Sequence, residues 1–258
     1  MTDHLLGPEG DNCGAELLVT RQGPILVMTL NRPWARNALT SGMTRALHAA
    51  IGELADDDGL RVGVLHGAGE GFCAGIDLKA FAASGPPDGL RDLLRKRAAK
   101  PLVAAVEGFA MAGGLELALM CDLVVAARGA KVGLPEARHG LLASGGGLFR
   151  LPSALATEMA LTGAVLSAER LAECGVIARL TDPGSALATA TSLAEAVAAN
   201  APLSVAAALQ LLRARPGRTE DEMWDIQVPL RDMVFGSADA REGATAFSQK
   251  RPPQWAGC

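Results

Sequence analysis

Two glutamates stand where a charged side chain is unexpected, and a carboxylate can act as a general acid or base. Glu116 lies in "GGLELALMCD" (113–122), where apolar residues would surround it on every side of a helix. Burying an isolated ionised carboxylate costs free energy. The sequence therefore indicates that Glu116 either has a dedicated partner or is kept in the interior for its chemistry.

Glu136 is the second candidate acid. It follows Pro135 in "KVGLPEARHG" and precedes the glycine run "SGGG" (144–147). A chain that turns back twice between the two glutamates would bring Glu136 towards the start of the helix that carries Glu116. Two carboxylates in an apolar cleft can hold different protonation states and divide acid and base work. The alternative is that Glu136 is a solvated glutamate of a surface loop.

Two glycine-rich loops, "GEGFCAGID" and "FAMAGGLE", each follow a predicted strand. Glycine permits positive φ and a close approach of the backbone to a ligand. The second loop leads into a helix, so its unpaired N–H groups and the helix dipole can bind an anion or stabilise an oxyanion. Neither loop fits the dinucleotide-binding or phosphate-binding glycine patterns. Ordinary tight turns are the alternative for both loops.

The elements that must position these residues follow from the hydrophobic pattern. Short apolar runs predict strands at 24–31, 61–67, 101–108, 122–127 and 131–135. Helices are predicted at 40–54, around Glu116, in a basic segment after Pro86-Pro87, at 153–162, 167–174, 185–200 and 202–214, and twice between 219 and 249. Alternating strands and helices followed by helices alone predict an α/β core with an α-helical C-terminal part.

Length and composition favour a globular protein. A chain of 258 residues is long for one domain but common for a single α/β domain. Apolar residues make up 49% and aromatic residues 3%, so the core is expected to consist of small aliphatic side chains. The net charge of −4 argues against a nucleic-acid-binding protein. An anionic ligand would need local positive contacts.

The cysteines and histidines suggest neither a disulfide framework nor a metal site. The five cysteines are scattered, without CxxC spacing, and no histidine has a partner motif for a triad or a metal. The first residues lack the features of a signal peptide. The longest uncharged stretch, Ala196 to Leu212, is too short and polar for a membrane span. We therefore expect a cytoplasmic protein with reduced thiols, no metal and no membrane contact.

Six motifs in order resemble the crotonase superfamily, also called the enoyl-CoA hydratase/isomerase superfamily. The resemblance covers almost the whole chain. The matching segments are "LNRPWARNAL", "GFCAGIDLK", "VEGFAMAGGLELALMCDLVVAA", "GLPEARHGLLASGGGLFRLP", "LTGAVLSAERLAECGVI" and "EGATAFSQKRPPQW". One such motif would be weak support, whereas six with matching order and spacing give a strong assignment.

The resemblance implies an α/β fold, a crotonase-like spiral of ββα units with a C-terminal α-helical trimerisation region. Residues 1–200 would form the core, with a loose leader at 1–15, and residues 201–258 the oligomerisation region. It also implies a homotrimer, or a hexamer built as a dimer of trimers. The implied substrate is an acyl-CoA thioester, with no cofactor besides the coenzyme A of the substrate.

The activity implied by the resemblance is that of an enoyl-CoA hydratase. In the family, two backbone N–H groups bind the thioester oxygen, and these fall here on Ile76 and Gly113. Glu116 would activate and orient the water, and Glu136 would supply the proton at Cα. The positions matched to coenzyme A binding are Arg36, Ala38, Ala74, Lys79, Phe247 and Lys250, the last of which can reach the ligand of a neighbouring subunit.

One departure from the family pattern concerns the glycine run. "SGGGLF" has Leu148 and Phe149 where many straight-chain hydratases have a polar pair, so the substrate preference is open. The segment looks closer to the branch that includes crotonobetainyl-CoA (carnitinyl-CoA) hydratases. A Δ3-Δ2 enoyl-CoA isomerase and a non-catalytic acyl-CoA-binding subunit are further alternatives. Asp77 and Asp122 are expected to fix loop or helix ends, and Cys73 and Cys121 to be small core residues.

Overall fold

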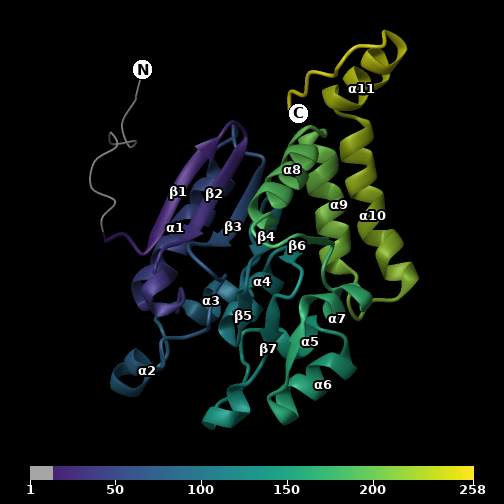
Figure 1. Ribbon diagram of the computed structural model, residues 1–258. Helices are drawn as coiled ribbons and strands as arrows, with labels where there is room; N and C mark the ends of the chain where they lie inside the picture. The colour runs from purple at the N-terminus through teal and green to yellow at the C-terminus, as the bar shows by residue number, and fades with distance from the viewer. Residues whose placement is uncertain (1–13) are drawn as a thin grey trace.

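A six-stranded sheet forms the centre of the computed structural model, which describes residues 14–258 (Figure 1). The expected leader at 1–15 falls almost wholly outside these residues. The strand order is β1-β2-β3-β4-β6-β9. β1 pairs antiparallel with β2, and the other neighbours pair parallel. The strands are β1 (Leu17–Gln22), β2 (Ile25–Leu30), β3 (Val62–Gly67), β4 (Leu102–Val106), β6 (Leu123–Ala127) and β9 (Arg179–Thr181).

A second sheet of three short strands lies beside the first. It contains β5 (Phe109–Met111), β7 (Lys131–Gly133) and β8 (Val165–Ser167) in that order. β4 and β6 belong to the large sheet, and each is followed after a short link by a strand of the small sheet and then by a helix. Each such ββα turn adds one strand to each sheet, which is the winding expected from the resemblance.

The helices occupy both faces of the large sheet and the C-terminal side of the molecule (Figure 1). They are α1 (Ser41–Asp56), α2 (Leu78–Ser84), α3 (Leu90–Arg95), α4 (Gly113–Met120), α5 (Gly147–Arg150), α6 (Ser153–Thr162), α7 (Ala168–Glu173), α8 (Ala186–Ala198), α9 (Pro202–Ala214), α10 (Glu220–Phe235) and α11 (Ala238–Ser248), with the 3-10 turns η1 (Pro33–Ala35) and η2 (Glu136–His139).

Alternate residues of each central strand enter two different cores. In β2, Leu26 and Met28 join the large core that contains α1, α3 and α4. Ile25 and Val27 join a smaller core closed by small side chains of α8. Strands covered on both faces read as continuous apolar runs, which explains the uninterrupted hydrophobic segments in the sequence. The large core is the one that packs against α4.

The C-terminal helices leave the body of the protein (Figure 1). α8 lies on the sheet, the chain then bends by 111° into α9, and α10 packs against α9. α11 is held by the final residues, because the buried carboxylate of Asp239 accepts hydrogen bonds from the amides of Ala256 and Gly257. No single helix within residues 14–258 is long and apolar enough to cross a membrane.

Most predicted elements are confirmed, and the differences concern short segments. The predicted helices at 153–162 and 202–214 have the observed bounds, and the Thr40 hydroxyl caps α1 as expected by accepting from the amide of Met43. Four strands (β1, β5, β8 and β9), the helices α2 and α5 and the two 3-10 turns were not predicted. The strand predicted at 131–135 ends at Gly133, where the chain turns into η2.

Candidate active site

The two candidate acids start from neighbouring strand ends. β5 and β7 pair in parallel, with Met111 opposite Gly133. β5 leads into α4 with Glu116, and β7 leads into η2 with Glu136. The amide of Ala112 donates to the carbonyl oxygen of Gly133 over 2.8 Å, which joins the two strands at the ends from which the chain leaves them. Carboxyl ends of parallel strands meet at one edge, and this edge carries both glutamates.

Glu116 is buried, with 4% of its surface exposed, and its carboxylate is held by the glycine run. Its Oε1 accepts hydrogen bonds from the amides of Gly145 at 2.7 Å and Gly147 at 3.0 Å. Burial raises the pKa of Glu116, while these amides and the charge of Arg150 oppose the rise. Glu116 therefore has dedicated partners, one of the two explanations that the sequence left open, and these are the backbone amides of the glycine run.

Glu136 is also buried, at 9% exposed, but its Oε2 has no hydrogen-bond partner among the described residues. Burial raises the pKa of Glu136 to about 7, and the nearby negative charge of Glu116 adds to the rise. An unpartnered buried carboxyl oxygen favours the protonated form. At neutral pH the Glu136 carboxyl is thus poised to release or take up a proton.

The glycines of the run leave no room for side chains. A β-carbon at Gly145 would contact Leu94 Cδ1 and lie 2.6 Å from Glu116 Oε2. A β-carbon at Gly147 would lie 3.0 Å from Leu134 Cδ1 and 3.2 Å from Glu116 Cγ. Only glycine lets the backbone approach the carboxylate this closely. Sequence reasoning noted the run but missed its role as the donor to Glu116, because the donors are main-chain groups.

Ile76 and Gly113 come together from the two glycine-rich loops. The amide of Met111 donates to the carbonyl oxygen of Cys73 over 2.9 Å, so the loops run side by side. A β-carbon at Gly75 would lie only 3.3 Å from the nitrogen of Gly113. Within residues 14–258, neither the Ile76 nor the Gly113 amide donates to a protein acceptor. Both N–H groups are therefore available to a ligand oxygen.

The residue before Gly113 adopts a rare backbone conformation. Ala112 has φ of 53° and ψ of −130°, although it is not a glycine. Its amide is bound to Gly133 and its carbonyl accepts from the amide of Glu116, so hydrogen bonds hold it there. Such conformations cost on the order of 1–3 kcal/mol and cluster at functional sites. The strain at Ala112 sets the direction of the Gly113 amide at the start of α4.

Four residues matched to coenzyme A lie on the loops around this edge. Arg36 is exposed at φ of 52° and lines a cavity of about 280 Å³. Its carbonyl accepts from the amide of Ala74, and the carbonyl of buried Ala38 accepts from Arg32. Lys79 is exposed in the first turn of α2. Arg36 and Lys79 are free to meet phosphates, while Ala38 and Ala74 offer only main-chain groups and small side chains.

Phe247 and Lys250 lie away from the loops that carry the other four residues matched to coenzyme A. Phe247, 86% exposed, lies on α11, and Lys250 follows it with φ of 53°. Figure 1 shows α11 at the opposite end of the molecule from α2. Phe247 and Lys250 therefore lie apart from Lys79 of the same chain, and the prediction that Lys250 serves a neighbouring subunit stays open.

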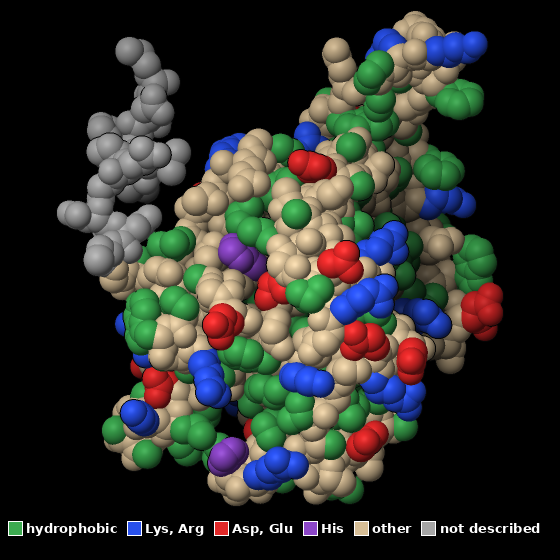
Figure 2. Space-filling model, in the orientation of Figure 1, with side chains coloured by type: hydrophobic (Ala, Val, Ile, Leu, Met, Phe, Trp, Pro, Cys, Tyr) green, Lys and Arg blue, Asp and Glu red, His purple; other side chains and the backbone are tan. Residues whose placement is uncertain are grey.

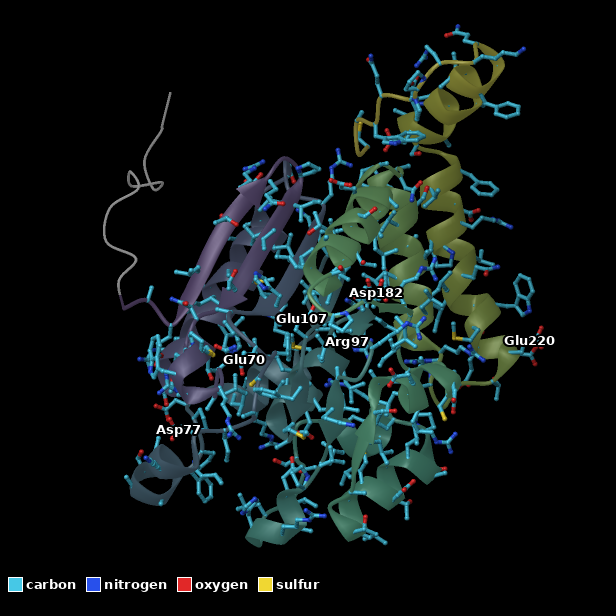
Figure 3. The ribbon with its side chains drawn as sticks, in the orientation of Figure 1. Glu70, Asp77, Arg97, Glu107, Asp182 and Glu220 are labelled. Carbon is cyan, nitrogen blue, oxygen red and sulfur yellow. The ribbon has the colours of Figure 1, made fainter. Side chains whose placement is uncertain are left out.

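Other conspicuous polar residues are structural. Asp77, labelled at the start of α2 in Figure 3, accepts from the amides of Lys79 and Ala80, as expected for a helix cap. Asp122 accepts from the amide of Leu102 and from Arg213. The Cys73 thiol is buried, which raises its pKa to about 12. No group of metal ligands occurs among the residues that the structure describes.

Comparisons with known proteins agree with this geometry. A family model described as enoyl-CoA hydratase/isomerase matches residues 20–258.

The chain belongs to the enoyl-CoA hydratase/isomerase family.

Relatives within this family have two different names. An enoyl-CoA hydratase of Mycobacterium tuberculosis is 40% identical over 94% of this chain and 97% of its own length. A carnitinyl-CoA dehydratase of Salmonella arizonae is 39% identical over 93% of this chain and 98% of its own length. The crystal structure of an enoyl-CoA hydratase from Mycobacterium marinum, 47% identical, has a TM-score of 0.90 and covers 95% of this chain and 100% of that one. The crotonase fold is thus confirmed.

Proposed function

We propose that this chain catalyses the reversible addition of water across the α,β double bond of an enoyl-CoA thioester. The observation that carries the proposal is the contrast between two buried acids at adjacent strand ends. Glu116 accepts hydrogen bonds from two amides, whereas Glu136 has a buried oxygen without a partner among residues 14–258. These surroundings suit opposite protonation states, which an acid–base pair requires. The relative named enoyl-CoA hydratase supports the same reaction.

The amides of Ile76 and Gly113 are the proposed oxyanion hole. When water adds at Cβ, negative charge develops on the thioester oxygen as an enolate forms. Two preorganised N–H donors stabilise that charge, and loss of one such donor costs about 2.7–4 kcal/mol in a studied enzyme. The loops that carry the two amides run side by side, and neither amide has an acceptor among the described residues, which supports this role.

The two glutamates complete the reaction with balanced protons. Glu116, as carboxylate, takes one proton from the water while the water oxygen bonds to Cβ. Glu136, as carboxylic acid, gives its proton to Cα as the enolate collapses to the thioester. One proton is taken and one is given, so exchange with solvent resets the pair. The reverse reaction, loss of water, exchanges the two duties.

The remaining parts of the proposal concern binding and assembly. Arg36 and Lys79 would meet the phosphates of coenzyme A, and main-chain groups at Ala38 and Ala74 its adenosine part. Residues 201–258 would form the oligomerisation region of a trimer or a dimer of trimers. Phe247 and Lys250 would then reach the ligand of a neighbouring subunit. The reaction needs no cofactor besides the substrate's coenzyme A, and we place the protein in the cytoplasm.

A second candidate substrate is crotonobetainyl-CoA. The identity of 39% to a carnitinyl-CoA dehydratase is almost equal to that of the hydratase relative. The chemistry at the two glutamates would be the same, and only the group beyond Cβ would differ. The apolar replacements Leu148 and Phe149 lie in α5, directly after the glycines that hold Glu116, and Phe149 is 80% exposed, so this segment is a place where the choice can be made.

The deciding experiment follows the loss of the conjugated-thioester absorbance. Crotonyl-CoA and crotonobetainyl-CoA are tested side by side with the wild type, Glu116→Gln and Glu136→Gln. We expect hydration by the wild type and its loss in each variant, while both variants stay folded. Near-normal turnover by Glu116→Gln would refute the mechanism. Turnover of a 3-enoyl-CoA with one glutamate alone would indicate an isomerase, and binding without any turnover a non-catalytic subunit.

A further inference from the structure

Arg150 reaches two carbonyl groups that belong to different parts of the candidate site. Its Nη1 donates to the carbonyl oxygen of Gly145 over 3.1 Å, and its Nη2 donates to that of Leu94 over 2.6 Å. Gly145 is one of the two amide donors to Glu116. Leu94 belongs to α3 and is 56 residues away in the sequence. The guanidinium thus joins the glycine run to α3.

The local backbone is built around this guanidinium. Gly146 has φ of +108°, and a β-carbon there would lie 2.9 Å from Cζ of Arg150. The amide of Arg150 donates to the carbonyl of Gly146 over 3.0 Å. The ring of Phe149 lies 5.9 Å from the guanidinium carbon, within range of a cation–π contact. These contacts leave the half-buried Arg150 side chain little freedom.

The segments that Arg150 joins, α3 and the glycine run, lie against the Glu116 carboxylate. Gly145 lies between Leu94 and Glu116, since a β-carbon there would contact atoms of both. A movement of α3 or of the glycine run would therefore move the amides that hold Glu116. Misplacing a reacting group by about 1 Å can cost on the order of 100-fold in rate.

We propose that Arg150 is a positioning residue for hydration, because its forked hydrogen bonds lock the glycine run to α3 and so fix the direction of the Glu116 carboxylate. The inference rests on the proposed function. A lysine is a poor substitute, since an ammonium lacks the planar fork of donors. Like the glycine amides, the charge of Arg150 opposes the rise that burial produces in the pKa of Glu116.

The test compares Arg150→Lys with the wild type on crotonyl-CoA. We expect kcat to fall about 10- to 100-fold with little change in KM. The acidic limb of the pH profile should move to higher pH, because lysine keeps the charge but loses the fork, and displaced glycine amides then oppose the effect of burial on the pKa of Glu116 less. In Arg150→Ala, added guanidinium ion should restore part of kcat and methylammonium should not. Arg150 lines a cavity of about 670 Å³ through which the ion can enter.

Arg213→Lys is the matched control. The guanidinium of Arg213 is also half-buried, and it donates hydrogen bonds to two groups, the carboxylate of Asp122 and the carbonyl of Ala98. It lies beyond the other end of α4, so its loss should lower thermal stability but leave kcat and the pH profile unchanged. Unchanged kinetics in Arg150→Lys, or the same kinetic loss in Arg213→Lys, would overturn the inference.

A readout without turnover separates this inference from the proposed function. The titration of Glu116 can be followed by carboxyl carbon NMR in the wild type and in Arg150→Lys, with Glu116→Gln to assign the signal. We expect the titration to move to higher pH in Arg150→Lys. If the wild type hydrates neither crotonyl-CoA nor crotonobetainyl-CoA, the proposed function fails. If the titration does not move, the role of Arg150 fails.

Discussion

At the scale of single residues, Glu116 and Glu136 carry the same functional group in different surroundings. Two glycine amides and a nearby arginine favour the charged form of Glu116 against burial. Glu136 has a negative neighbour and a buried oxygen that accepts no hydrogen bond from the part of the chain that the structure describes. Because the side chains are identical, the division of labour between them depends on the backbone around each one.

The elevated pKa of Glu136 makes stability depend on pH. A carboxyl whose folded pKa lies above its ordinary value destabilises the fold as pH rises between the two values, here from 4.5 to about 7. Glu136→Gln removes this ionisation. Above that window, the free energy of unfolding of the variant should exceed that of the wild type by roughly 2–3 kcal/mol. Below the window the two values should be nearly equal. Denaturant unfolding on both sides of the window measures the difference; an equal difference on both sides would contradict the prediction.

Gly145→Ala should reduce activity by about 10-fold or more, because the new β-carbon must displace Leu94 or the Glu116 carboxylate. The change is read as kcat on crotonyl-CoA. Gly52→Ala is the control, since Gly52 lies in α1 with nothing within 4 Å of the added carbon. That variant should be stabilised by about 0.5–1 kcal/mol with normal kcat. A wild-type value of kcat in Gly145→Ala would contradict the prediction, because it would show that the glycine run accommodates the β-carbon without displacing Glu116.

The sequence predicts some site residues better than others. Glu116 is visible because it is the single charge of an apolar run. The donors to Glu116 are not, because main-chain amides carry no residue-type signal. Arg150 looks like any surface arginine until the fold brings Leu94 to it from 56 residues away. Residue types reveal which groups can do chemistry, while long-range contacts decide how those groups are held.

At the scale of elements, Glu107 shows how one side chain starts a distant helix. Its carboxylate accepts from the amides of Gly184 at 3.1 Å and Ala186 at 2.8 Å, at the N-terminus of α8. Figure 3 labels it between the sheet and this helix. Unpaired amides at a helix start are satisfied by such acceptors. The carboxylate thereby ties the end of β4 to the helix that covers the sheet.

Glu107→Ala should therefore destabilise the protein by about 1–2 kcal/mol without changing kcat per folded molecule, because it removes a cap and leaves the site intact. Glu107→Gln keeps an acceptor oxygen, so its loss of stability should be smaller. Thermal unfolding and kcat are measured on the same samples. A large loss of kcat at full folding would place Glu107 in the reaction instead.

Most long elements were predictable, whereas most of the short ones were not. α6 lies between Pro152 and Gly163, and α9 begins at Pro202, so proline and glycine marked their ends and the predicted bounds were correct. β5, β8 and β9 have three residues each, too few for any pattern to emerge. β1 is an edge strand with mostly exposed residues, so it lacks the apolar run of its neighbours. Their pairing comes from tertiary contacts, and β5 is the strand that leads to Glu116.

At the scale of the whole molecule, α10 and α11 expose a row of large apolar side chains. Figure 2 shows hydrophobic groups projecting along the edge that these helices form. The exposed residues are Trp224, Val228, Met233, Phe235 and Phe247. Exposed apolar surface of this kind is typical of interaction sites, which supports the proposed oligomerisation through this region.

Phe235→Glu should weaken that assembly, because it would bury a charge in the contact. Light scattering should report a lower molar mass, and KM for crotonyl-CoA should rise if Phe247 and Lys250 serve a neighbour. Leu161→Glu is the control, since Leu161 is similarly exposed at 78% on α6, away from α10. An unchanged mass in Phe235→Glu would place the contact elsewhere.

The link between β4 and β5 consists only of Glu107 and Gly108, and Gly108 has φ of +52° against the carbonyl of Glu70. Such a link has no slack to absorb a change in chain length. One inserted residue in β4 would exchange the two core faces of every later position in the strand and rotate α4 by about 100° relative to its partners. Homologues should therefore vary freely in length at the loop between α2 and α3, and keep a constant count from Leu102 to Glu116.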